Sequence, residues 1–393
     1  MRWILLIAFF LLNFTLPNNS FSQNEIRIGL TISETGHFSA EIGPFRKLAE
    51  AWADDTNKEG GLTVGREPFK IKLFIYDDRS DEATARRMYE RLAVVHKVHF
   101  MFGPYSSPLT LAASTAAELH SIPFLAICAN SPKIYTRGYR WLLCVIDEAP
   151  RYTYRYWDMI RSKGNVNSVS FVVEDTIHPQ GVFEGARKLA EDAGISDINY
   201  YIAPPDMRDF SSILVKLVKD NSDIVFVSSN IPFAIKFISQ VQEMQLKAKE
   251  FHVIHHGGVF RKALGEGAEY ITGQSYWTPG MKGGQQERFI RLLKTSRISV
   301  DDYPWTPAYM MAFEVLEATL KKTGTIEASP IIDTMKSMEI ETIGGIVSFK
   351  DNGAGSINTY PSQIRNGEYN IVGPSEVATG EHIYPRPGYN NIR

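Results

Sequence analysis

The sequence predicts an α/β fold with two units, each built on a mostly parallel sheet. Short apolar runs alternate with amphipathic segments from Glu25 onward, and a second alternating series starts after Pro150. Strands that alternate with helices pair in parallel and carry helices on both faces of the sheet. The length of 393 residues also exceeds what one typical hydrophobic core accommodates, which favours two units.

In the first unit, continuous apolar runs predict strands and apolar residues at helical spacing predict helices. The first helix carries Phe45, Leu48 and Trp52 on one face and ends at Gly60-Gly61. The predicted strands are 26–31, 69–76, 98–102 and 122–127. The later helices are 81–97 and 109–120.

The second unit repeats this alternation. Its predicted helices are 152–163, 181–193, 210–219 and 232–246, and its strands are 168–173, 198–202, 224–228 and 251–255. The C-terminal part has helices at 285–294, 307–321 and 329–337, followed by short strands at 344–349, 357–365 and 369–372. Asn352-Gly353 and Asn366-Gly367 separate these strands, and Asn-Gly pairs are hairpin signals.

The N-terminal segment has the pattern of a secretory signal peptide. Arg2 precedes an apolar run from Trp3 to Leu12, and Ser20-Phe21-Ser22 supplies small residues before a cut at Gln23. The run is shorter than the ~20 residues of a membrane span. We therefore expect residues 1–22 to be removed and the mature protein to be periplasmic.

Charge and cysteine usage narrow the class of protein. The formal charge of −2 argues against a nucleic-acid partner, which would favour a basic face. The two cysteines, Cys128 and Cys144, adjoin apolar strand-like runs, so two buried thiols are expected although an exported protein permits a disulfide.

A serine-containing turn precedes the helix at 109–120. Tyr105, Ser106 and Ser107 are followed by Pro108, a residue suited to the first helical turn. Such a helix start offers free backbone N–H groups and the positive end of the helix dipole to an anion. Asn130-Ser131-Pro132 forms a similar start. An ordinary capping role is the alternative for both segments.

These turns follow strand ends, which is where open α/β sheets bind ligands. In the second unit the equivalent loops are 174–180, 228–231 and 255–259. If the two units face each other, the loops converge on one cleft, with hinge closure around a ligand.

Short motifs occur in a fixed order along nearly all of the mature chain. They are IRIGLT (26–31), TG (35–36), NKEGGL (57–62), YDDRSD (76–81), GPYSSPLT (103–110), SP (131–132), RGY (137–139), EDT (174–176), DFS (209–211), DIV (223–225), AT (378–379) and IYP (383–385). With these motifs the chain resembles the leucine/isoleucine/valine-binding family of periplasmic solute receptors.

The resemblance implies two Rossmann-like lobes joined by a three-segment hinge, the type I periplasmic binding fold. It places 23–144 plus 277–343 in the N-terminal lobe and 145–276 plus 344–393 in the C-terminal lobe. It also implies a protein without catalysis or cofactor that delivers a small-molecule solute to the membrane subunits of an ABC permease. The ligand-binding residues expected on this basis are Tyr105, Ser106, Ser107, Cys128, Ala129, Asn130, His178, Asn230, His256, Gly257 and Trp277.

In amino-acid-binding members of that family, positions matching Ser106-Ser107 and 128–130 hold the α-carboxylate, and an acid in the loop matching 255–258 pairs with the ammonium. That loop reads His255-His256-Gly257-Gly258 here. Glu41, Glu174, Asp175 or an aromatic face could replace the acid, or the ligand lacks an amine. An amino acid, an aromatic or other organic acid and an amide all stay open.

Other functions have less support from the residues. His255-His256 suggests a metal site, but adjacent residues of an extended segment point in opposite directions, so no metal is expected. Common nucleophile and phosphate-binding motifs do not occur. A ligand sensor that signals to a partner protein, or a hydrolase built on Ser106 and a distant histidine, remains as an alternative.

Overall fold

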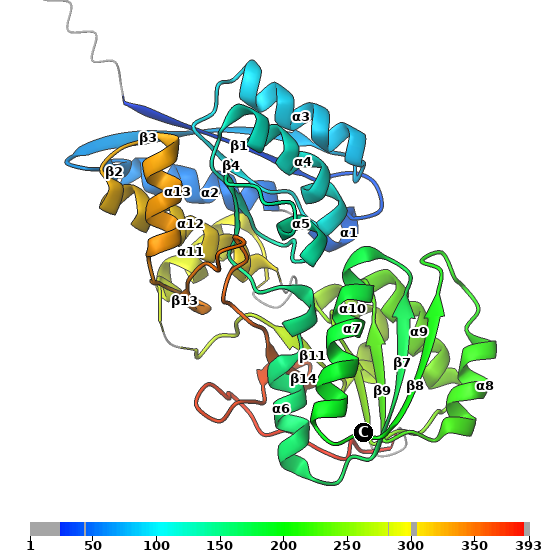
Figure 1. Ribbon diagram of the computed structural model, residues 1–393. Helices are drawn as coiled ribbons and strands as arrows, with labels where there is room; N and C mark the ends of the chain where they lie inside the picture. The colour runs from blue at the N-terminus through cyan, green and yellow to red at the C-terminus, as the bar shows by residue number, and fades with distance from the viewer. Residues whose placement is uncertain (1–23, 43–44, 282, 300–304, 389–393) are drawn as a thin grey trace, which may run out of the picture.

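The computed structural model describes residues 24–388, apart from 43–44, 282 and 300–304. The predicted signal peptide, residues 1–22, lies outside the described residues. Two α/β bodies follow one another along the long axis of the molecule, each built around its own sheet (Figure 1). The predicted α/β class with mostly parallel sheets is confirmed.

The first sheet has six strands: β1 (Glu25–Ile32), β2 (Leu62–Val64), β3 (Glu67–Asp77), β4 (Phe100–Phe102), β5 (Phe124–Ala126) and β6 (Leu142–Cys144). Their order is β2-β3-β1-β4-β5-β6. All neighbours pair in parallel except β2 and β3. The carboxyl ends of β4 and β5 therefore meet at one edge of the sheet.

Helices from two separate parts of the chain cover this sheet. They are α1 (Ser39–Ile42), α2 (Phe45–Lys58), α3 (Glu82–Val94), α4 (Ser107–His120) and α5 (Pro132–Tyr135), then α11 (Gln286–Ser296), α12 (Thr306–Thr323) and α13 (Ala328–Ser337). Trp52 of α2 stacks on Phe313 of α12 with ring centroids 4.2 Å apart. The late helices thus contribute to the core of the first lobe, and Figure 1 shows them beside α2.

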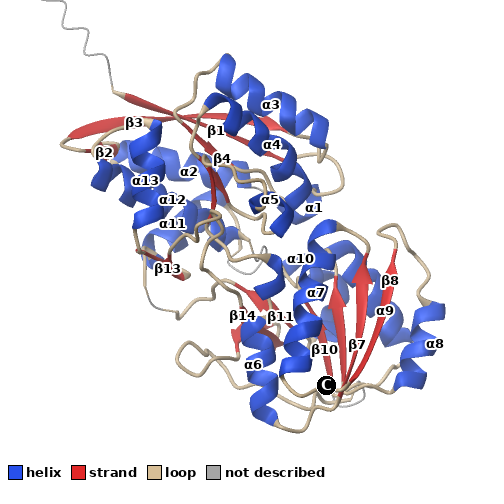
Figure 2. Cartoon of the chain, in the orientation of Figure 1, coloured by secondary structure: helices blue, strands red, loops and turns tan. Residues whose placement is uncertain are grey.

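The second sheet has seven strands: β7 (Ser168–Glu174), β8 (Asp197–Ala203), β9 (Ile224–Ser228), β10 (Glu250–Val253), β11 (Thr272–Ser275), β14 (Tyr360–Arg365) and β15 (Glu368–Ile371). Their order is β15-β14-β11-β10-β9-β7-β8. The strands from β11 to β8 pair in parallel, and β14 and β15 add an antiparallel edge (Figure 2). The Asn366-Gly367 turn joins β14 to β15, as predicted.

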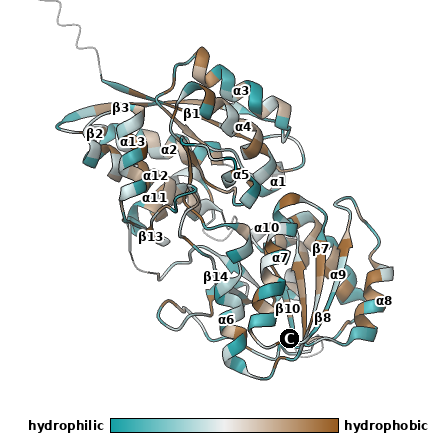
Figure 3. Cartoon of the chain, viewed as in Figure 1, coloured by the Kyte–Doolittle hydropathy of each residue, from teal (hydrophilic) through white to brown (hydrophobic). Residues whose placement is uncertain are grey.

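The helices of the second lobe are α6 (Tyr154–Lys163), α7 (Ile177–Asp192), α8 (Ser211–Asp220), α9 (Ile231–Glu243) and α10 (Gly258–Leu264), with 3₁₀ turns η1 (Ala149–Arg151) and η2 (Gly265–Ala268). Hydrophobic residues gather in the strands and on the inner helix faces, whereas hydrophilic residues lie outside (Figure 3). This distribution buries the β7 and β9 strands on both faces, as central parallel strands require.

The chain passes between the lobes along three segments: after β6, after β11 and before β14. β6 ends at Cys144 and β11 ends at Ser275. The third segment follows a small two-stranded sheet of β12 (Ile340–Thr342) and β13 (Gly345–Val347). The residues at which each lobe begins and ends stay a prediction.

The Asn352-Gly353 pair reverses the chain, as predicted, but it does not join two strands of a sheet. An isolated antiparallel bridge pairs Phe349 with Gly355, and inside it the Lys350 N–H donates to the Ala354 carbonyl at 2.8 Å. β13 pairs with β12 and not with the strand that follows the turn. The turn also packs on the end of β6, where the Cys144 N–H donates to the Gly353 carbonyl at 2.9 Å. Gly353 has a φ of +90° and lies against the Leu142 carbonyl, a place that admits no side chain.

Within the described part of the chain, no helix is both long and apolar enough to cross a membrane.

Candidate functional site

A cavity of about 440 Å³ lies between the lobes. Its lining includes α1 with the residues just before it and the β4–α4 and β5–α5 loops of the first lobe, and the β7–α7, β8–α8, β9–α9 and β10–α10 loops of the second. Each of these loops follows the carboxyl end of a parallel strand. The cavity therefore occupies the place that the strand order dictates for a ligand.

The start of α4 faces the cavity with a strained serine. Ser106 precedes the helix with φ 78° and ψ 149°, a backbone region that residues other than glycine rarely adopt. Its side chain makes no capping hydrogen bond, and its buried Oγ has no partner in the structure. The strained backbone thus holds a buried hydroxyl at the positive end of a helix dipole.

Asn130 lies beside this helix start because β4 and β5 are neighbours. Tyr105 and Cys128 form a parallel bridge beyond the strand ends, and the Ser131 N–H donates to Ser107 Oγ at 3.2 Å. The Asn130 side chain is buried, and its Nδ2 has no partner. Ser106 and Asn130 therefore bring two unpartnered hydrogen-bonding groups to one wall.

Glu41 contributes a carboxyl group to the same wall. It accepts a hydrogen bond from the Tyr105 hydroxyl at 2.5 Å, and Trp305 Nε1 donates to its main-chain carbonyl at 3.2 Å. Burial raises the pKa of Glu41 to about 7, with the nearby charge of Glu174 acting in the same direction. Glu41 therefore binds its proton more tightly than an exposed glutamate does.

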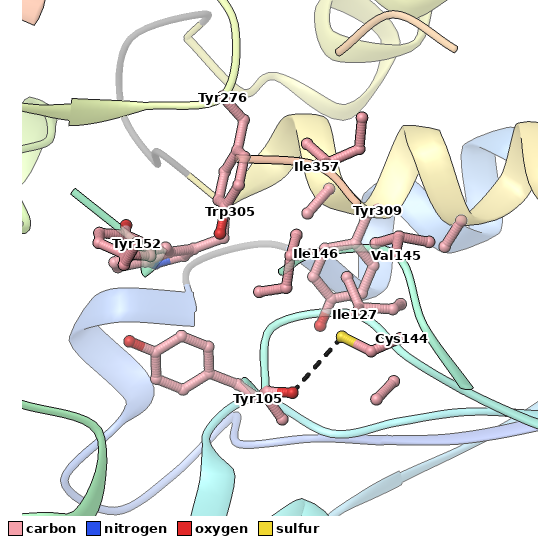
Figure 4. Close-up of a cluster of buried hydrophobic side chains, with 14 of the residues drawn as sticks. Tyr105, Ile127, Cys144, Val145, Ile146, Tyr152, Tyr276, Trp305, Tyr309 and Ile357 are labelled. Atoms are coloured by element: carbon pink, nitrogen blue, oxygen red, sulfur yellow. Dashed lines mark hydrogen bonds between the residues drawn. The ribbon is translucent and has the colours of Figure 1, made fainter. Parts of the chain in front are cut away.

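Aromatic rings form much of the remaining wall. Tyr105 lies 5.5 Å from Trp305, and Tyr152 lies 6.3 Å from Tyr276, between ring centroids. Figure 4 shows these rings next to the buried residues around Cys144. They give the cavity a largely apolar surface that suits the hydrocarbon body of a small ligand.

The second lobe presents another helix start, that of α9. Its N-cap residue, Asn230, donates from its backbone N–H to Glu174 at 2.7 Å and from Nδ2 to the same carboxylate at 3.2 Å. Burial raises the pKa of Glu174, and the Asn230 hydrogen bonds oppose that rise. A carboxylate of the protein thus already occupies the positive end of α9.

Two histidines of the second lobe connect to Asn130 of the first. His178 Nδ1 lies 2.8 Å from Asn130 Oδ1, and His178 Nε2 lies 3.2 Å from His255 Nε2. The two ring planes are parallel to within 1°, and the Tyr152 ring meets each of them edge-on. Burial lowers the pKa of His178 to about 4 and that of His255 well below its ordinary value. Both rings are therefore neutral at pH 7.

The charge of the lining follows from these residues. Of the described residues that line the cavity, none is lysine or arginine, and the acids are Glu41, Glu174 and Asp206. The described residues also contain no group of three or more His, Cys, Asp or Glu side chains that could hold a metal ion.

Seven of the eleven sequence-predicted site residues line the cavity: Tyr105, Ser106, Ser107, Cys128, Asn130, His178 and Asn230. Cys128 and Cys144 are free thiols, as expected. Cys144 Sγ donates to the Ala129 carbonyl at 3.4 Å, the hydrogen bond drawn in Figure 4.

The other four predicted residues do not line the cavity. Ala129 is buried, and its carbonyl accepts from the Tyr135 hydroxyl. His256 points away to Ser362, at 3.1 Å, because its neighbour His255 takes the cavity side of an extended segment. Gly257 caps α10. Trp277 packs edge-on against Phe289 and donates to Gln286, while Tyr276 faces the cavity.

Sequence reasoning left out several lining residues, namely Phe38, Tyr152, His255, Tyr276 and Trp305. The His255-His256 pair and the aromatic concentrations near 276 and 305 were visible signals. In His255-His256 and in Tyr276-Trp277, the residue that faces the cavity is set by the exact end of the preceding strand. A shift of one residue would turn the other member of the pair inward. Glu41 and Glu174 reach the cavity, whereas Asp175 is not among the lining residues.

Comparison with known proteins agrees with this architecture. Residues 25–368 match the periplasmic binding protein family. The Leu/Ile/Val-binding protein homolog 1 of Brucella abortus is 22% identical over 362 residues, covering 88% of this chain and 93% of that protein.

Two solved structures share the fold. The branched-chain amino acid transporter substrate binding protein LivJ of Streptococcus pneumoniae, in complex with isoleucine, has a TM-score of 0.76 and 19% identity, covering 92% of this chain and 100% of that one. A solute binding protein of R. palustris in complex with 4-hydroxybenzoate has a TM-score of 0.75 and 16% identity, covering 94% and 99%. The chain belongs to the periplasmic binding protein family, and it shares the two-lobe type I fold of these solved structures.

Proposed function

We propose that this protein is a periplasmic solute-binding protein that captures a small carboxylate-bearing solute between its lobes and delivers it to an ABC permease. The solute is an amino acid or a related organic acid. Proteins of this family bind small solutes and work with ABC permeases, and the family is exported to the periplasm. The predicted signal peptide, cleaved between Ser22 and Gln23, supports the same location for this chain.

The unpartnered buried groups at the start of α4 carry the proposal. Ser106 Oγ and Asn130 Nδ2 both lie in the lining without a hydrogen-bond partner. Leaving such a group unsatisfied costs about 1–3 kcal/mol, so two of them together mark a place where a ligand supplies acceptors. A carboxylate supplies two acceptor oxygens, and the positive end of α4 favours its charge.

The rest of the cavity supports a small ligand with an apolar body. The lining is rich in aromatic rings, and the volume falls within the usual range for small-molecule sites. Isoleucine and 4-hydroxybenzoate, which the two structural neighbours bind, both carry a carboxylate and a compact hydrocarbon part. That shared chemistry agrees with the groups presented here.

A thermal-shift screen tests the proposal. The mature protein is mixed with amino acids, aromatic acids, aliphatic acids and the primary amides of the same acids. A ligand at 100 times its Kd stabilises the folded state by about 2.7 kcal/mol, so binders raise the melting temperature by several degrees. We expect acids to bind and their amides to bind far less, with the bound acid recovered unchanged. Binding of amides as tightly as acids, or chemical turnover, would refute the proposal.

A further inference from the structure

Asn130, His178 and His255 form a continuous hydrogen-bonded chain across the cavity. Asn130 belongs to the first lobe and both histidines to the second. This series of three side chains has a hydrogen-bonding group without a partner at each end, because Asn130 Nδ2 and His255 Nδ1 are buried and have no partner. Asn130 is 1% exposed and His255 is 2% exposed. Both residues line the cavity, so a solute bound there lies beside the two free groups.

With both rings neutral, the protons of Asn130, His178 and His255 can be placed in only two ways that satisfy both hydrogen bonds. A neutral imidazole has one N–H donor and one bare nitrogen acceptor. If Asn130 accepts from His178 Nδ1–H, then His178 Nε2 is bare and must accept from His255 Nε2–H, which leaves His255 Nδ1 bare. If the Asn130 amide is rotated by 180°, every bond reverses and His255 Nδ1 carries the proton. In both cases the two ends offer one donor and one acceptor.

A carboxylate on the first lobe selects the first arrangement. It accepts from Ser106 Oγ–H and Asn130 Nδ2–H, so Asn130 Oδ1 faces His178 and His255 Nδ1 is left as an acceptor. Resting on the proposed function, we propose that Asn130, His178 and His255 form a relay that requires the solute to carry a hydrogen-bond donor, a hydroxyl or an ammonium, in addition to its carboxylate. His255 is the residue that contacts the donor, and His178 is a positioning residue.

The surroundings of the relay support neutral rings. Tyr152 and Trp305 pack edge-on against His255, with the Trp305 ring 4.3 Å away between centroids. The other titratable side chains facing the cavity are His37, Glu41, Tyr105, Cys128, Glu174, Asp206 and Tyr276. None of the hydrogen bonds recorded for Glu41 and Glu174 involves His178 or His255, and burial disfavours the charged form of both rings.

Two matched pairs of acids test the requirement for a donor by isothermal titration. 4-Hydroxybenzoate is compared with benzoate, and leucine is compared with 4-methylpentanoate. We expect at least a tenfold preference for the donor-bearing member, in the first pair if the donor is a hydroxyl and in the second if it is an ammonium. In His255→Phe, which keeps a ring of similar size, and in His178→Phe, the preference falls below twofold. His120→Gln, on the surface, keeps it.

A preference below twofold in both pairs for the wild-type protein would overturn the relay while leaving carboxylate binding intact. Binding of none of the four acids would count against the proposed function instead. The relay would then be tested by determining which ring nitrogens of His178 and His255 carry protons, a measurement that needs no solute and no variant.

Long-range ¹⁵N–¹H spectra of the histidine rings supply that measurement at pH 7. We expect His178 and His255 to carry their single protons on opposite nitrogens, one on Nδ1 and the other on Nε2. A bound acid fixes the proton of His178 on Nδ1 and that of His255 on Nε2. The same tautomer in both rings, or two protons on either ring, would overturn the relay.

Discussion

Two helix starts, one from each lobe, open onto the cavity and differ in what occupies them. Both α4 and α9 have a proline in the first turn, Pro108 and Pro232. At α9 the protein supplies its own anion, because Glu174 accepts from the Asn230 backbone and side chain. At α4 no side chain caps the helix, and Ser106 Oγ has no partner.

The difference indicates which lobe binds the charged group of the solute. A helix N-terminus favours a carboxylate in either lobe, but at α4 the Ser106 hydroxyl has no partner, whereas at α9 Asn230 already donates to Glu174. The resident carboxylate at α9 would also repel a second anion. We therefore propose that the first lobe binds the solute carboxylate and that the second lobe recognises the rest of the molecule.

The largest loss of affinity is expected for Asn130→Leu. This change removes a donor to the solute and leaves His178 Nδ1 without its partner. Hydrogen bonds to charged groups contribute about 1.5–3 kcal/mol, so we expect roughly a 100-fold weaker Kd. Isothermal titration with an acid from the screen measures it. A change below threefold would place the carboxylate elsewhere.

Ser106→Gly separates the effect of the strained backbone at Ser106 on stability from the effect of its hydroxyl on binding. Glycine adopts the φ of 78° without strain, so the melting temperature rises, whereas the lost hydroxyl weakens acid binding by about tenfold. Ser121→Gly is the matched control, because Ser121 at the other end of α4 also has a positive φ, 54°. It should raise the melting temperature and leave Kd unchanged. Unchanged affinity in Ser106→Gly would contradict the anchor.

The Glu41 carboxyl group makes affinity depend on pH. Its folded-state pKa of about 7 lies above the ordinary glutamate value of 4.5, so its proton is lost as pH rises through 7 and a negative charge enters the cavity. We expect the Kd for an acid to weaken by up to about tenfold from pH 6 to pH 8. Glu41→Gln should flatten this profile. A profile of equal slope in the variant would exclude Glu41 as the cause.

The same shift affects stability with a defined sign. Between pH 4.5 and 7 the folded state holds the Glu41 proton more tightly than the unfolded state does. Its contribution to the free energy of unfolding therefore decreases as pH rises through this window and is restored as pH falls. Denaturant titrations at pH 5 and pH 8 measure the free energy of unfolding of wild type and of Glu41→Gln. The change in this free energy between the two pH values is then compared for the two proteins.

The smallest effect on affinity is expected for Glu174→Gln. The amide keeps an acceptor for the Asn230 N–H but removes the charge at the start of α9, at a cost of about 1 kcal/mol in stability. The Kd for an acid should change by less than threefold. A tenfold loss would show that the second lobe also binds the carboxylate, and the contrast between the helix starts would fail.

The sequence predicted the fold more completely than the site. Alternating apolar patterns located most strands of both sheets because burial on both faces leaves a strong signal, as in β7 and β9. The short strands β2 and β11 were not predicted. Ser106 and Asn130 were found because strand ends in a parallel sheet converge. The choice of His255 over His256, and of Tyr276 over Trp277, depends on the last residue of a strand, which periodicity does not fix.

Contacts between the lobes were also beyond the sequence. The hydrogen bond from Asn130 to His178 joins residues 48 apart in the chain, and no local pattern encodes it. The Asn352-Gly353 pair shows the same limit. It turns the chain as its local preference favours, but β13 pairs with β12 instead of with the strand after the turn, and the turn packs against Leu142 and Cys144.

The central claim is that the start of α4 binds the carboxylate of the solute. A double-mutant cycle tests it most directly, with wild type and Ser106→Ala each titrated with the tightest-binding acid and with its primary amide. We predict that the substitution weakens binding of the acid at least tenfold more than binding of the amide. Equal losses for acid and amide would contradict the claim.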